Sequence, residues 1–167
     1  MDRSDIANEI IPGLWLGDVR ASRDGEFLRE KGIVAVFNCT KDLPFYEGSW
    51  NKYRVPVDDN LKPEEIRNME LYSFEAVYKL CIEVKRGPVL VHCYAGMQRS
   101  AAVVAMFLIA SSKFKVEQAI AYIRSKRAIA FTPGPNFMQS MQSFERVMDT
   151  TPKGSAGGSA SGGGSWF

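Results

Sequence analysis

The chain has 167 residues, of which 46% are hydrophobic and 24% are charged, and its 21 basic and 19 acidic side chains leave a formal charge of +2. This length suits one domain with its own core, and the near balance of charge argues against a dedicated nucleic-acid-binding protein. The best candidate for a membrane span, residues 101–110, is far shorter than the roughly 20 residues required, so we expect no membrane association.

Short runs of β-branched or aromatic residues, bounded by Gly, Asp or Pro, predict strands at 14–17, 33–38, 53–57 and 88–92. Apolar spacing with start and stop signals predicts helices at 24–32, 62–87, 100–112, 115–126 and 136–148. The helix over 100–112 is apolar on nearly every side, so it should be central and buried. Strands that alternate with helices predict one α/β domain whose mostly parallel sheet has helices on both faces.

The end of the chain differs from the rest in composition. Residues 154–165 contain only Gly, Ser and Ala, which cannot form a core. We therefore predict a domain over 1–150 and a flexible tail over 151–167, an engineered linker that ends in Trp-Phe. The alternative is a tether whose two terminal aromatic residues dock on the same or a neighbouring chain.

The cysteines suggest where the protein resides. Cys39, Cys81 and Cys93 are odd in number and form no disulfide framework. The first ten residues contain no apolar segment of the kind found in secretory signals. Both features predict an intracellular protein, in the cytoplasm or the nucleus, where thiols stay reduced and can react.

One cysteine stands where an α/β sheet places its site. Cys93 follows the predicted strand 88–92, and sites form beyond the carboxyl ends of such strands. The turn between this strand and the next helix must be tight, with Gly96 free to adopt a conformation that other residues avoid. Such a turn directs several backbone N–H groups to one point and forms an anion cradle.

Two further residues complete this chemistry. Arg99 supplies a planar, permanent positive charge whose geometry matches phosphate oxygens, and the same positive field stabilises a thiolate at Cys93. Ser100 can donate its hydroxyl toward the sulfur. The arrangement predicts a thiolate nucleophile beneath a bound phosphate.

These residues carry a family resemblance. The signature H-C-x-x-G-x-x-R-S of the cysteine-based protein phosphatases is matched by His92, Cys93, Gly96, Arg99 and Ser100. Over about residues 8–148 the chain resembles the dual-specificity branch, whose successive landmarks look like "IIPGLWLGDVRAS", "GIVAVFNCT", "YRVPVDDN" and "KRAIAFTPGPNFMQSMQSFE". The resemblance implies a sheet of four or five strands and hydrolysis of phosphotyrosine, phosphoserine and phosphothreonine in proteins. It also implies a phosphocysteine intermediate, with neither metal nor other cofactor.

The resemblance also assigns roles within the loop. It implies that Cys93 is the nucleophile, that Arg99 is catalytic, and that His92 and Ser100 have supporting roles, His92 by orienting the loop. The phosphate, or another oxyanion, would be bound by Tyr94, Ala95, Gly96, Met97, Gln98 and Arg99.

The reaction also requires an acid that protonates the departing oxygen and then activates water. The family's strand-then-Asp pattern matches Asp59, and strand alternation would direct Asp58 to the opposite side. The alternatives are that both residues only cap the following turn, or that the acid is Glu64 or Glu65.

The loop sequence argues against two other classes of substrate, phosphoinositides and RNA 5′-phosphates. The loop has no Lys or His between Cys93 and Arg99, whereas phosphoinositide phosphatases of this family carry added cations there. Loop residues that the RNA 5′-phosphatases favour are also absent. A third alternative is a phosphatase-like module that binds phosphoproteins without turnover, against which the intact Cys93, Arg99 and Asp59 argue.

The chain departs from the family near its last helix. Family members often have Pro-Asn where this chain has Pro133-Gly134, and Asn136 follows two residues later. Arg127 is predicted to form a surface salt bridge, with contact to a second phosphate as the alternative.

Overall fold

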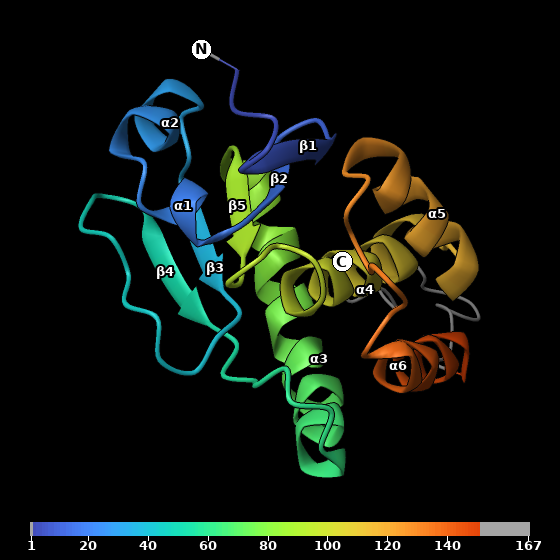
Figure 1. Ribbon diagram of the computed structural model, residues 1–167. Coiled ribbons are helices and arrows are strands. Elements are labelled where there is room, and N and C mark those ends of the chain that lie inside the picture. The colour runs from blue at the N-terminus through green and yellow to red at the C-terminus, as the bar shows by residue number, and fades with distance from the viewer. Residues whose placement is uncertain (1, 151–167) are drawn as a thin grey trace.

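The computed structural model describes residues 2–150, whose strands form one five-stranded sheet in the order β1-β2-β5-β3-β4 (Figure 1). The strands are β1 (Ala7–Ile11), β2 (Leu14–Gly17), β3 (Ala35–Asn38), β4 (Asn51–Arg54) and β5 (Val89–His92). β1 pairs with β2 in the antiparallel sense, and the other neighbours are parallel. The predicted mostly parallel sheet is confirmed, and the tail over 151–167 lies outside the described residues.

The helices begin and end close to their predicted positions. They are α1 (Val19–Ser22), α2 (Gly25–Glu30), α3 (Pro63–Arg86), α4 (Arg99–Ser112), α5 (Val116–Lys126) and α6 (Met138–Thr150). α3 begins at a proline followed by two glutamates and ends with two basic residues before Gly87, as the proline and dipole preferences favour. The single turn of α1 was not predicted, and the Asp18 side chain stabilises it by accepting hydrogen bonds from two backbone N–H groups.

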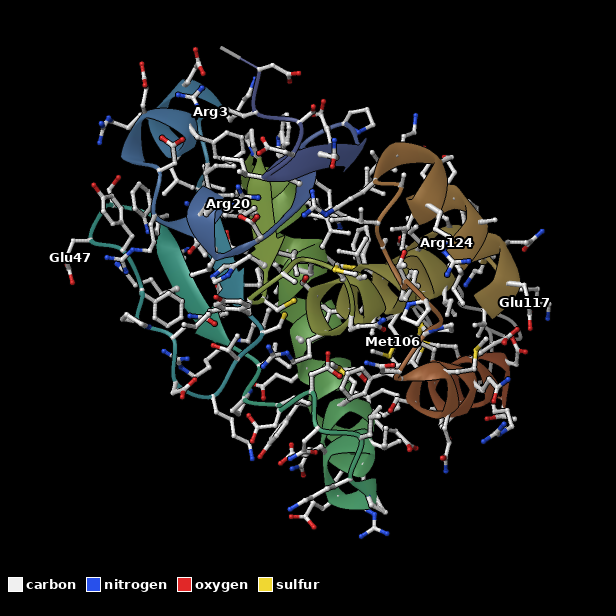
Figure 2. All side chains as sticks on the ribbon, viewed as in Figure 1. Arg3, Arg20, Glu47, Met106, Glu117 and Arg124 are labelled. Atoms are coloured by element: carbon white, nitrogen blue, oxygen red, sulfur yellow. The ribbon has the colours of Figure 1, made fainter. Side chains whose placement is uncertain are left out.

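The sheet is covered on both faces, as predicted. Side chains that alternate along the central strands face two different layers. Phe37 and Val91 pack with the larger layer of α3 to α6, whereas Val36 and Leu90 pack with the smaller layer that includes α2. Figure 2 shows the fully buried Met106 on the central helix α4, which confirms the prediction for this helix.

β4 differs from its prediction in a way that affects the site. The strand covers Asn51–Arg54, two residues before the predicted start, and it forms an edge of the sheet. Pro56 lies within the predicted strand but has no N–H to donate, so regular pairing ends before it. The following segment, residues 55–61, is irregular, and strand alternation therefore does not decide which aspartate faces the site.

The carboxyl ends of the parallel strands meet at one edge of the sheet. Cys93 follows β5, and Cys39 follows the neighbouring β3, where its N–H donates to the His92 carbonyl at 2.8 Å. Asp18 follows β2 on the other side of β5. The topology thus brings four loops together around Cys93, including the segment that follows β4. None of the described helices is long and apolar enough to cross a membrane.

Candidate active site

The segment between β5 and α4, residues 93–99, is here called the Cys93 loop. Cys93 is 2% exposed, and Gly96 has φ +67°, in the left-handed region that favours glycine. A Cβ atom at this position would lie 2.6 Å from the Gly17 carbonyl oxygen, so the close approach of the loop to β2 also requires glycine. The predicted tight turn is therefore present.

The backbone of the Cys93 loop is oriented in one sense. The carbonyls of residues 94–97 all accept hydrogen bonds from groups outside the loop, namely Val19 N–H, two nitrogens of Arg127 and Phe131 N–H. By contrast, no backbone N–H of residues 94–99 donates to another group in the described part of the chain. Because the C=O and N–H of a trans peptide point in opposite directions, carbonyls held on the outside leave N–H groups directed inward. The loop therefore has the donors of an anion site.

Two neighbours of Cys93 are arranged as the sequence predicts for supporting groups. The Ser100 hydroxyl lies 3.1 Å from the Cys93 sulfur, within hydrogen-bonding distance. The Nδ1 atom of His92 lies 3.1 Å from the Cys93 carbonyl oxygen. Burial lowers the pKa of His92 to about 4, so the ring is neutral at physiological pH. His92 is thus suited to holding the loop and not to proton transfer.

The other two cysteines differ from Cys93 in their surroundings. Burial raises the pKa of Cys81 to about 12 and that of Cys39 well above its ordinary value. Neither lines the pocket above Cys93. In the reduced protein, both therefore behave as buried apolar side chains, as predicted from the sequence.

Arg99 connects the loop with the segment after β4. Its NH1 group donates to the Val57 carbonyl at 3.0 Å, which fixes the guanidinium at the edge of the loop. Its Nε atom is buried and has no hydrogen-bond partner among the described residues. A buried donor without a partner is costly, and a bound oxyanion would satisfy it.

A pocket of about 270 Å³ opens above Cys93. Its lining combines the loop with residues from two distant segments: Asp59, Cys93, Tyr94, Ala95, Met97, Gln98, Arg99, Thr132 and Asn136. The structure thus brings Asp59 together with Cys93 and Arg99, the three predicted catalytic residues. The side-chain amide of Asn136 donates to an Asp59 carboxylate oxygen at 2.9 Å.

Asp58 is held away from this pocket. Its N–H donates to the Glu65 carboxylate at 3.1 Å, and its own carboxylate lies 3.6 Å from Lys41. Glu65 is buried and also accepts from Lys41, and this hydrogen bond is the main cause that holds the pKa of Glu65 below its ordinary value. Asp58 and Glu65 are therefore engaged with each other and with a lysine, which leaves Asp59 as the carboxylate beside Cys93.

Comparison with known proteins identifies the family of this chain. The family model described as "Dual specificity phosphatase, catalytic domain" matches residues 14–147. The chain belongs to this family. The predicted family is thereby confirmed; its members are protein phosphatases, which are phosphoric monoester hydrolases.

Named relatives and solved structures give the same answer. Rat dual specificity protein phosphatase 4 is 32% identical over 156 residues, which cover 92% of this chain and 38% of the rat protein. Human DUSP28 superposes with a TM-score of 0.72 at 26% identity, covering 86% of this chain and 95% of that structure. A mouse putative dual specificity phosphatase in complex with zinc tungstate has a TM-score of 0.74 at 25% identity, covering 87% of this chain and 89% of that structure. The chain thus spans well under half the length of its rat relative.

In the phosphatase domain, Arg127 is buried and does not lie at the surface as predicted. This residue is 2% exposed and forms no salt bridge in the described part of the chain. Its Nε donates to the Gly96 carbonyl at 2.9 Å, and its NH2 donates to the Ala95 carbonyl at 3.3 Å. Its NH1 donates to Asn8 Oδ1 on β1 at 2.9 Å. The predicted surface salt bridge was wrong because the tertiary fold packs the end of α5 behind the Cys93 loop, which the helical pattern does not reveal.

The phosphatase domain also shows how the end of the site near Pro133-Gly134 is braced. The buried Gln98 side chain donates to the carbonyls of Thr132 and Gly134, at 3.2 and 2.9 Å, and accepts from the Asn136 N–H at 2.8 Å. Gln98 thus holds the segment from which Asn136 reaches Asp59. The prediction compared the family's Pro-Asn pair with Pro133-Gly134, but the next two residues, Pro135-Asn136, form such a pair and are the sequence signal for the role of Asn136.

Proposed function

We propose that this domain is a dual-specificity protein phosphatase that hydrolyses phosphotyrosine, phosphoserine and phosphothreonine through a phosphocysteine intermediate. One observation carries the proposal. The buried Cys93 lies under a loop whose carbonyls at residues 94–97 are held outward and whose N–H groups at residues 94–99 have no partner among the described residues, in a pocket shared with Arg99 and Asp59. Such a site offers a nucleophile, an oxyanion cradle and an acid within one small volume.

In the first step, the Cys93 thiolate attacks the phosphorus atom. The S–P bond forms as the P–O bond to the substrate breaks, and Asp59 donates its proton to the departing oxygen. The N–H groups of the loop and the free Nε of Arg99 donate to the phosphoryl oxygens, on which charge rests in the transition state. The products of this step are the dephosphorylated protein and a phosphocysteine.

In the second step, the ionised Asp59 accepts a proton from a water molecule, whose oxygen attacks the phosphorus. The S–P bond breaks, and Cys93 leaves as a thiolate. The Ser100 hydroxyl, 3.1 Å from the sulfur, stabilises that leaving group by donating to it. Inorganic phosphate leaves, and the site returns to its starting state with Asp59 protonated.

The shape of the pocket favours more than one phosphorylated side chain. Tyr94 at its mouth is 64% exposed, and a second hollow of about 360 Å³ adjoins it at Asp59 and Arg99. A mouth of this kind admits short serine and threonine esters as well as tyrosine esters. The Cys93 loop has no Lys or His, and Arg99 is its one cationic side chain, which disfavours a phosphoinositide headgroup as the substrate. The mouse relative was solved in complex with zinc tungstate, and tungstate is a tetrahedral oxyanion like phosphate.

A direct assay tests the proposal. We expect the purified chain to hydrolyse p-nitrophenyl phosphate in the presence of a metal chelator, and to release phosphate from both phosphotyrosine and phosphothreonine peptides. A 5′-triphosphorylated RNA and a phosphoinositide, offered at the same concentration, should be poorer substrates. Binding of a phosphopeptide without turnover would replace the proposal with a phosphoprotein-binding module. Preference for the RNA or the lipid would exclude the protein substrate.

A further inference from the structure

Arg127 occupies an unusual place for a buried charge. It lies at the end of α5, yet its guanidinium faces the outer side of the Cys93 loop. A buried arginine normally pairs with a carboxylate, because an unpaired charge is costly in the interior. Here its three nitrogens donate to two loop carbonyls and to a neutral asparagine. The excess positive charge therefore remains in the region of the site.

The contacts of Arg127 are directed at specific peptide groups. The peptide whose carbonyl belongs to Ala95 carries the N–H of Gly96, and the next peptide carries the N–H of Met97. Because C=O and N–H are opposed in a trans peptide, holding both carbonyls on the outside turns both N–H groups toward the anion. The other two outward carbonyls of the loop are held by backbone N–H groups, which no substitution of a side chain removes.

The fit between this arginine and the loop is close. A Cβ atom at Gly96 would lie 2.9 Å from Arg127 NH2, so the guanidinium packs directly against the loop backbone. Burial lowers the pKa of Arg127, whereas the negative charges of Asp18 and of the Cys93 thiolate oppose that shift. Asp18 and the more distant Asp5 are both paired with Arg20, and Asp18 also caps α1, so neither forms an ion pair with Arg127.

We propose that Arg127 is a positioning residue of the phosphate site: anchored by Asn8, it orients the Gly96 and Met97 N–H groups toward the bound oxyanion and adds a second positive charge from behind the loop. This inference rests on the proposed function for its catalytic consequence, but its effect on anion binding does not require turnover. It also gives β1, which lies before the matched family region, a part in the site.

The central test compares Arg127→Met with Arg124→Met. Arg124 lies in α5 (Figure 2), whose C-cap is Arg127, and it also donates to two backbone carbonyls, those of Ala130 and Phe131, but no hydrogen bond in the described part of the chain joins its side chain to the Cys93 loop. We expect Arg127→Met to weaken binding of inorganic phosphate, measured by calorimetry, by about tenfold or more. It should lower kcat/KM for p-nitrophenyl phosphate by about 100-fold. Arg124→Met should change both by less than about threefold.

Two further variants separate positioning from a general loss of structure. Arg127→Lys keeps the charge but cannot reach all three acceptors, so phosphate binding should weaken while the pH profile of Cys93 alkylation by iodoacetamide stays in place. In Arg127→Met, which loses the charge, that profile should move to higher pH. Asn8→Ala removes only the anchor and should weaken phosphate binding by about fivefold.

The outcomes distinguish this inference from the proposed function. If Arg127→Met does not fold, Arg127→Lys and Asn8→Ala carry the test through phosphate binding, and unchanged binding in both would overturn the inference. A folded Arg127→Met with wild-type phosphate affinity would overturn it as well. If the wild-type chain binds phosphate without hydrolysing esters, the proposed function fails, and the loss of binding in Arg127→Met still supports the inference.

Discussion

The Cys93 loop and the segment that carries Asp59 meet in one pocket but are held in opposite ways. The loop is fixed by hydrogen bonds to four consecutive carbonyls, from α1, from Arg127 and from Phe131. The segment over 55–61 is irregular, and among the described residues only Asn136 donates a hydrogen bond to the exposed Asp59 carboxylate. Under the proposed function, the difference means that the anion site is preorganised, whereas the acid can adjust to departing groups of different size.

The largest expected effect comes from removing the nucleophile and leaving the rigid cradle. Cys93→Ser should lower kcat by about 10⁴-fold or more, because a serine hydroxyl is a far weaker nucleophile than a thiolate. Phosphate-ester binding should persist, since the loop N–H groups and Arg99 remain. Steady-state kinetics and calorimetry with a non-hydrolysable phosphonate check both parts. Activity within tenfold of wild type would show that Cys93 is not the nucleophile.

The second prediction concerns the adjustable side of the site. Asp59→Asn should slow phenyl phosphate hydrolysis by about 100-fold, because a poor leaving group needs protonation. A fluorinated, acidic aryl phosphate departs readily as an anion and should be slowed much less.

Asp58→Asn is the matched control for this variant. Its carboxylate faces Lys41, so it should show no leaving-group dependence and only a modest loss of activity. If the two variants exchanged behaviours, the acid would be Asp58, and the contact between Asn136 and Asp59 would have no catalytic meaning.

A smaller effect should follow from releasing Asp59 while keeping its carboxylate. Asn136→Ala removes the one hydrogen bond that the Asp59 carboxylate accepts from the described residues, and it should slow phenyl phosphate hydrolysis by about fivefold. The fluorinated substrate should be hydrolysed at the wild-type rate, because the Cys93 loop is untouched. Equal slowing of both substrates would mean that Asn136 acts on the cradle through Gln98 and not on the acid.

The smallest prediction concerns stability and the buried His92 of the loop. The pKa of His92 is about 4 in the folded chain and 6.5 in the unfolded chain, so below pH 6.5 only the unfolded chain binds this proton. Stability is therefore lost as pH falls from 6.5 toward 4, by about 1 kcal/mol between pH 7 and 5.5. Urea unfolding at the two pH values should show this loss in wild type and not in His92→Gln. An equal loss in both would assign it to other groups.

Much of the site could be predicted because its central part is contiguous in the sequence. Cys93, Gly96 and Arg99 lie within seven residues, and a buried strand followed by an apolar helix gives their location. The helices were also predictable, since apolar spacing and terminal residues mark their ends. The strand predicted over 53–57 lies too late in the sequence compared with β4. Val55 and Val57 look like strand residues, although Pro56 between them has no N–H with which to pair.

The remaining parts depend on contacts between distant segments. Asn136 and Asp59 are separated by 77 positions, and Arg127 and Asn8 by 119. Local patterns assign a residue to an element but do not state which loop faces it. Asn8 lies in β1, whose short sequence ANEII mixes polar and apolar residues too closely to predict a strand. From the sequence alone, an arginine at a helix end is predicted to lie at the surface, because the pattern does not show what packs against that end.

The position of Cys39 beside Cys93 has a consequence for oxidative control. β3 and β5 are paired in parallel as far as Asn38 and His92, and the Cys39 N–H donates to the His92 carbonyl, so the two cysteines follow neighbouring strands at adjacent positions. Peroxide would convert the Cys93 thiolate to a sulfenic acid, and the Cys39 thiol would then displace water to form a disulfide. The buried Cys39 would thereby protect the nucleophile from irreversible oxidation, and a thiol reductant would restore it. Mass spectrometry of the peroxide-treated chain should find Cys39 linked to Cys93, whereas Cys39→Ser should accumulate sulfinic acid at Cys93.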